Sequence, residues 1–134
     1  EEEKKSLVQK TLELEAYLSG PAPDMETVGE MDRALNIQLA RMTRNPVFEW
    51  VMHALQQGFS SYDYALYDDS GYRQMTVANW KATAREIAAG EPLKALTFSG
   101  NHYLMLRRCV AEKSGVLSDR MHGLPQSEDS KNKA

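Results

Sequence analysis

Three polar side chains stand among the apolar residues of predicted helices, where they could bind a cation or a small polar ligand. Asp32 and Asn36 are four residues apart, so on a helix they share one face, beside an apolar stripe that includes Leu35 and Leu39. His102 lies midway along a second apolar stripe. A carboxylate and a neutral imidazole are good ligands for a borderline metal, and an amide oxygen is a weaker one. Asp32, Asn36 and His102 are therefore the candidate metal ligands.

Each of these residues also has a purely structural interpretation. A histidine in an apolar helix stripe is more often a hydrogen-bonded core residue than a ligand, and an Asp–Asn pair at this spacing is common. Trp80, at the matching place on another helix, is by itself a large core side chain. The chain contains no HExxH pair, CxxC pair, glycine-rich phosphate loop or GxSxG elbow. We therefore predict that it is not an enzyme.

Five predicted helices position these residues, and no β-like alternation is sustained anywhere in the chain. Asp24 and Asn45 are predicted N-caps, Pro46 suits a first helical position, and Gly90 suits a position just after a helix end. The predicted helices cover about residues 1–19, 25–43, 46–67, 72–89 and 92–113. Because the connecting loops are short, the fold class is predicted to be all-α, an antiparallel bundle of about five helices.

The apolar stripes of these helices are the predicted core of one domain, residues 1–116, followed by a polar C-terminal tail, residues 117–134. Four tyrosines, at positions 62, 64, 67 and 72, are expected to add aromatic surface at the end of the third helix. The stripes are Leu7, Thr11, Leu14 and Leu18; Val28, Leu35, Leu39 and Met42; Val47, Val51, Ala54, Leu55, Phe59 and Tyr62; Val77, Trp80, Ala84 and Ile87; Ala95, Phe98, His102, Met105 or Leu106, and Cys109.

Composition excludes several classes of protein. The 134 residues include 16 Lys plus Arg and 19 Asp plus Glu, a net charge of -3, which argues against a nucleic-acid-binding surface. No apolar run approaches the roughly 20 residues that span a bilayer, and no segment has the layout of a secretory signal. The single cysteine fits a reducing compartment. We predict a cytoplasmic domain with no membrane partner.

Three segments, in order, resemble the signature of one family. MDRALNIQLARMTRNP resembles D-x-x-x-H…(G)-N-P, and NWKATAREIAAGEPLKA resembles E-H-x-x-x-x-A-I-x-x-G-D-x-x-x-A. ALTFSGNHYLMLRR resembles the next helix, in which a His follows that glycine by twelve residues, as His102 follows Gly90. Together they cover about residues 25–112. Their order and spacing resemble the FCD domain, the effector-binding domain of FadR-subfamily GntR transcription regulators.

This resemblance implies a helical bundle with a central cavity, in which one Asp and three His bind a divalent metal that helps to hold a carboxylate-bearing effector. Asp32 then corresponds to the aspartate and His102 to the last histidine. Asn36 and Trp80 stand where the other two histidines are expected, so the metal site is degenerate. We therefore expect no metal cofactor, and a pocket that binds its effector by hydrogen bonds and by stacking on Trp80.

The resemblance predicts a ligand-sensing and dimerising domain of a bacterial regulator that binds a small organic or sugar acid. Such regulators bind DNA through an N-terminal winged helix-turn-helix, which the first residues here do not supply. The domain is thus expected to be truncated at its N-terminus. The alternative is a structural dimerisation module whose pocket is plugged by Trp80. The predicted ligand-binding residues are Asp32, Asn36, Trp80 and His102, with Arg44 and Asn101 as outer candidates.

Overall fold

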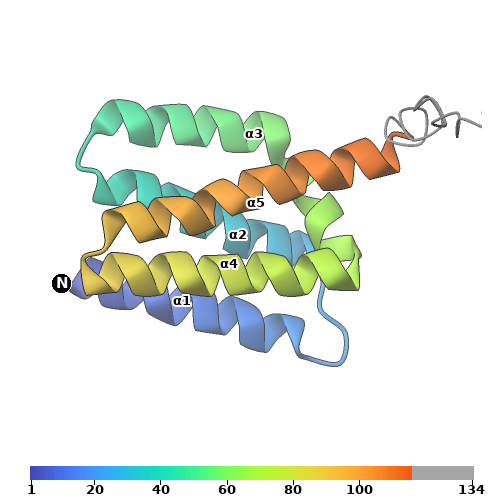
Figure 1. Cartoon of the computed structure of the whole chain (residues 1–134), viewed down its shortest axis with the longest axis horizontal. Helices are drawn as coiled ribbons and strands as arrows, with labels where there is room; N and C mark the ends of the chain where they lie inside the picture. The colour runs from blue at the N-terminus through green and yellow to red at the C-terminus, as the bar shows by residue number, and fades with distance from the viewer. Residues whose placement is uncertain (116–134) are drawn as a thin grey trace, which may run out of the picture.

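The described part of the chain forms an all-α antiparallel bundle, as predicted (Figure 1). The computed structural model describes residues 1–115, except for the side chains of residues 58–65; the predicted tail, 117–134, lies outside the described residues. None of the helices described is both long and apolar enough to cross a bilayer. The helices are α1 (Glu2–Leu18), α2 (Met25–Met42), α3 (Pro46–Asp68), α4 (Ser70–Ala89) and α5 (Pro92–Lys113).

The ends of the helices follow the local chemistry of the sequence. Asp24 accepts a hydrogen bond from the backbone N–H of Thr27 at 2.9 Å, which satisfies one of the N–H groups left open at the start of α2. Asn45 caps α3 in the same way, and Gly90 ends α4 with a left-handed φ of 78°. The predicted turn at residues 68–71 is wrong, because Asp69 alone separates α3 from α4 and caps α4.

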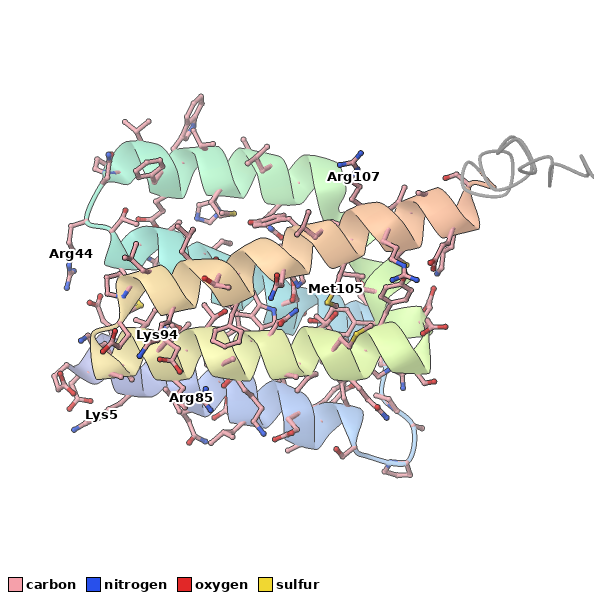
Figure 2. All side chains as sticks on the ribbon, viewed as in Figure 1. Lys5, Arg44, Arg85, Lys94, Met105 and Arg107 are labelled. Carbon is pink, nitrogen blue, oxygen red and sulfur yellow. The ribbon has the colours of Figure 1, made fainter. Side chains whose placement is uncertain are left out.

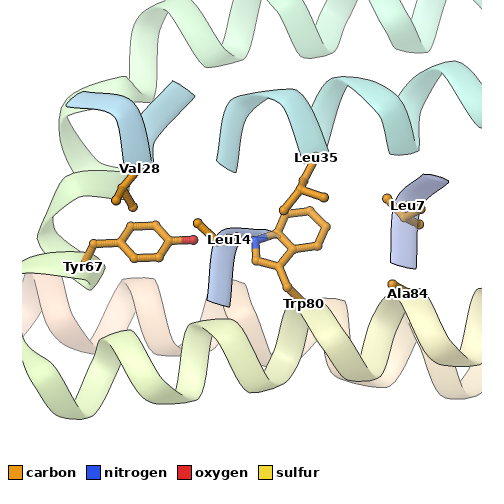
Figure 3. Close-up of a cluster of buried hydrophobic side chains, with 7 residues drawn as sticks. All are labelled: Leu7, Leu14, Val28, Leu35, Tyr67, Trp80 and Ala84. Atoms are coloured by element: carbon orange, nitrogen blue, oxygen red, sulfur yellow. The ribbon is translucent and has the colours of Figure 1, made fainter. Parts of the chain in front are cut away.

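The helices are arranged so that α3 and α1 lie along opposite edges of the bundle (Figure 1). α1 packs against α2 and α4, while α5 packs against α4 and α3. The predicted stripes of α1, α2 and α4 meet in the core, as Figure 3 shows. The buried core cluster consists of Leu7, Leu14, Val28, Leu35, Tyr67, Trp80 and Ala84.

The predicted orientation of α3 is wrong in its N-terminal half. Val47 and Val51 were expected to face the core, but their exposed fractions are 62% and 38%. Tyr67, at the other end of the helix, is completely buried. At about 100° per residue, Tyr67 lies roughly 160° around the helix from Val51. A straight helix that buries Tyr67 must therefore turn Val51 toward solvent.

Candidate functional site

The carboxylate of Asp32 is completely buried and joins α2, α3 and α4. Its Oδ1 accepts hydrogen bonds from the hydroxyl of Tyr67 at 2.6 Å and from the indole Nε1 of Trp80 at 2.7 Å. Its Oδ2 accepts one from the amide nitrogen of Asn36 at 3.0 Å. In Figure 3 the phenol oxygen of Tyr67 and the indole nitrogen of Trp80 point toward the same space. We call these four residues the Asp32 cluster.

The Asp32 cluster explains how an acid can stand inside this core. Removing a carboxylate from water is strongly unfavourable unless hydrogen-bond donors compensate for the lost hydration. Here three donors do so, and hydrogen bonds to an ionised acceptor are stronger than those between neutral groups. Since the donors come from α2, α3 and α4, the carboxylate also fixes the three helices relative to one another.

This arrangement does not fit a bound divalent metal. A metal ligand must turn a lone pair toward the ion, but Trp80 and Tyr67 turn an N–H and an O–H toward Asp32. Asn36 also turns its NH₂ group, rather than its oxygen, toward the carboxylate. Among the side chains that the structure describes, no three or more His, Cys, Asp or Glu residues gather as a metal site requires. The residues around Asp32 therefore form a hydrogen-bonded cluster in place of a coordination sphere.

His102 lies on the other side of Trp80, with 6.1 Å between the centroids of the two rings. Its Nδ1 is buried, with no hydrogen-bond partner among the described residues. Burial lowers the pKa of His102 below its ordinary value, and the nearby charge of Asp32 only partly opposes this effect. The sequence correctly placed His102 near Asp32 and Trp80, but no hydrogen bond joins His102 to the Asp32 cluster.

A small cavity of about 30 Å³ remains beside His102. This is about the volume that one water molecule occupies in the liquid, and cavities that hold drug-sized ligands measure roughly 300–1,000 Å³. The buried indole of Trp80 takes much of the interior space and completes the core cluster. The cavity is lined by Asn36, Leu39, Asn79, Trp80, Thr83, Ser99, His102 and Tyr103.

The two outer candidates lie outside this region. Arg44 stands in the turn between α2 and α3 and points away from the bundle (Figure 2). Its guanidinium is 75% exposed and forms an ion pair with Glu3 at 2.7 Å. Asn101 is on the exposed side of α5, where it borders a surface groove between α4 and α5. The structure therefore does not bring these two outer candidates to the Asp32 cluster or to the small cavity beside His102.

Tyr67 is the member of the Asp32 cluster that sequence reasoning missed. It was predicted as aromatic surface, whereas its side chain is fully buried and its hydroxyl donates to Asp32. The sequence offered only an indirect signal for this role of Tyr67. A buried acid needs donors, and a tyrosine near the end of a helix combines an apolar body with one donor.

A separate hollow is an open groove of about 710 Å³ between α1 and α4. Three cationic side chains line it, but each already has a partner within the chain. Lys81 pairs with Glu15 at 2.7 Å, Arg85 pairs with Glu86 at 2.9 Å, and Arg73 donates to a backbone carbonyl. Since no member of the Asp32 cluster lines this groove and its cations are engaged, we do not regard it as the candidate site.

The buried imidazole should make stability depend on pH. Because the folded state lowers the pKa of His102, the unfolded chain takes up its proton first, below about pH 6.5. We expect the free energy of unfolding to fall on acidification from pH 6.5 to 5.5, by up to about 1 kcal/mol from this group. Urea unfolding at both pH values should show a smaller loss in H102Q. The matched control, H53Q at a half-exposed histidine, should retain the full loss. An unchanged pH dependence in H102Q would contradict the prediction.

The fold and the Asp32 cluster define an all-α bundle with a buried polar centre, and comparison with known families places it more specifically. The profile of the FCD domain matches residues 1–104, so the chain belongs to the FCD domain family. FCD domains occur in GntR-type transcription regulators rather than in enzymes. No curated protein and no solved structure matches the chain significantly. The family match confirms the resemblance found in the three sequence segments.

Proposed function

We propose that this chain is the regulatory and dimerisation domain of a cytoplasmic GntR-type transcription regulator and that it works without a bound metal. Membership of the FCD family supports the regulatory role. One observation supports the absence of a bound metal: Trp80 and Tyr67 both donate hydrogen bonds to Asp32, the acid expected to bind metal in this family. DNA binding would belong to a winged helix-turn-helix outside this sequence, and no catalytic role is proposed.

The filled interior favours action through association of two copies over binding of an organic acid in the bundle. Trp80 is only 6% exposed and packs within the core cluster, so it behaves as a structural residue. The cavity that remains is about the size of one water molecule. The domain would then hold two DNA-binding parts at a fixed separation. This is the alternative given above, a structural dimerisation module whose pocket is filled by Trp80.

A second candidate function is the sensing of a small organic or sugar acid, and one feature specifically favours it. The Nδ1 atom of His102 is buried without a partner beside a cavity that Asn36, Asn79 and Thr83 also line. Tyr103, at the edge of the same cavity, is 58% exposed and lies edge-on to His102, with 5.7 Å between the ring centroids. An effector that bonds to His102 would act by binding one arrangement of two domains more tightly than another.

Calorimetric titration separates the two candidates. We expect no heat of binding at millimolar concentrations from a panel of sugar acids and small organic acids, with or without added Zn²⁺, Mn²⁺ or Ni²⁺. Elemental analysis of the dialysed protein should show far less than one metal ion per chain. A saturable heat that disappears in H102A but persists in H53A would support sensing. Stoichiometric metal in the purified protein would overturn the metal-free proposal.

A further inference from the structure

α3 carries an apolar surface on the side that faces solvent. We call Val47, Trp50, Val51, Ala54 and Leu55 the α3 outer face. Trp50 is 72% exposed and Leu55 is 44% exposed. On the printed sequence these residues recur at spacings of three and four, so they form one stripe along about two turns of helix. A stripe with this spacing normally lies against another helix.

The opposite side of α3, which faces the bundle, is more polar. Gln56 is the buried residue in this half of the helix, and its side-chain amide donates only to the sulfur of Met52, at 3.7 Å. Glu49, on the same side, is partly buried and pairs with Arg41. In its N-terminal half the helix therefore directs its more apolar side to solvent and its more polar side to the protein. The burial of Tyr67 explains how this rotation is fixed, but it leaves the outer face without a partner in the described residues.

The size of the outer face matches a protein interface. With aromatic side chains contributing about 150–250 Å² each, the exposed parts of these residues amount to on the order of 500 Å². Contiguous apolar patches of this size mark interaction sites, and a stable interface buries about 800 Å² on each partner. The outer face thus supplies more than half of one side of a stable interface, and Phe48, which is 57% exposed, adjoins it.

The charges around the outer face favour a second copy of this chain as the occupant. Residues 46–58 contain no Lys or Arg, so the face offers nothing to a phosphate backbone or to an anionic lipid surface. Their one acid, Glu49, is already paired with Arg41 at 2.7 Å. An uncharged straight stripe can approach its own copy without repulsion, and a twofold axis places the same patch on both sides.

We infer that α3 of one copy packs antiparallel against α3 of a second copy, with Val51 at the twofold axis. This inference rests on the proposed dimerisation and names its surface. Around that axis Val47 of one copy lies opposite Leu55 of the other, and Phe48 lies opposite the small side chain of Ala54. Helix pairs of this kind pack at an interaxial distance of roughly 8–10 Å.

Sedimentation equilibrium on the full chain tests this pairing. We expect a dimer for the wild type and, for V51E, a dissociation constant weakened on the order of 100-fold, because two carboxylates would meet at the axis. Val51 is already partly exposed in one copy, so the variant should fold, which circular dichroism checks. L93E is the matched control, since Leu93 is a 79% exposed leucine on α5. It should leave the dissociation constant unchanged.

A second variant provides a positive signal. V51C should form a disulfide-linked dimer on mild oxidation, because residues at a close twofold contact come within reach of a disulfide. L93C should not, and the one native cysteine, Cys109, is buried. A dimer that survives V51E and does not crosslink through V51C would overturn the α3 pairing while leaving dimerisation intact. A wild type that stays monomeric at hundreds of micromolar would contradict the proposed dimerisation itself.

Discussion

Replacing Asp32 by alanine should lower the free energy of unfolding by about 3–5 kcal/mol. The substitution removes the carboxylate that accepts hydrogen bonds from Tyr67, Trp80 and Asn36. Three donors in the core then lose this acceptor. It also leaves a cavity where the carboxylate stood. Because small domains are stable by only about 5–15 kcal/mol, much of the protein's stability would be lost. Urea unfolding followed by far-UV circular dichroism measures the change.

Two controls show whether the loss comes from the hydrogen bonds. E30A removes an exposed acid from the same helix, and it should change the free energy of unfolding by less than about 0.5 kcal/mol. Y67F removes one donor and keeps the ring, so it should lower stability by about 1 kcal/mol. If D32A were no more destabilising than E30A, water or a rearranged side chain would have to satisfy the donors, and the Asp32 cluster would not hold the helices together.

The helical fold could be predicted because the information for it is local. Asp24, Asn45 and Gly90 mark helix ends through bonds to backbone groups only a few residues away. The apolar spacing of α1, α2 and α4 likewise requires no knowledge of neighbouring helices. The rotation of α3 was not predictable in this way. Two sides of that helix could be buried, and the choice depends on what Tyr67 contacts in α2.

The candidate site was predicted in part, for the same physical reason. The family resemblance correctly brought Asp32, Asn36 and Trp80 together across two helices. It did not predict that Asn36 and Trp80, which stand where the family signature has histidines, would both donate hydrogen bonds to Asp32. That result depends on side-chain orientation, and so does the contribution of Tyr67. Because Asn36, Tyr67 and Trp80 all donate to Asp32, the buried carboxylate at this position is hydrogen-bonded without a metal.

That interpretation leads to the second large prediction, which concerns N36H combined with W80H. Both side chains now lie within hydrogen-bond distance of Asp32, so imidazoles at these positions would stand near its carboxylate. His102 would supply a further imidazole, which burial keeps neutral and able to bind metal. Removing the indole also opens space beside the small cavity. We expect the double variant to bind Zn²⁺ or Ni²⁺ with micromolar affinity, while the wild type binds neither.

Thermal unfolding and elemental analysis would measure this gain of binding. Without metal, the double variant should be less stable than the wild type, because Asp32 loses two of its donors. A metal concentration of 100 times the dissociation constant should then raise the free energy of unfolding by about 2.7 kcal/mol, and a chelator should reverse this increase. The matched controls are N36H and W80H alone, each of which lacks one ligand and should bind more weakly. A folded double variant that takes up no metal would mean that Asp32, Asn36, Trp80 and His102 do not occupy the ligand positions of the family.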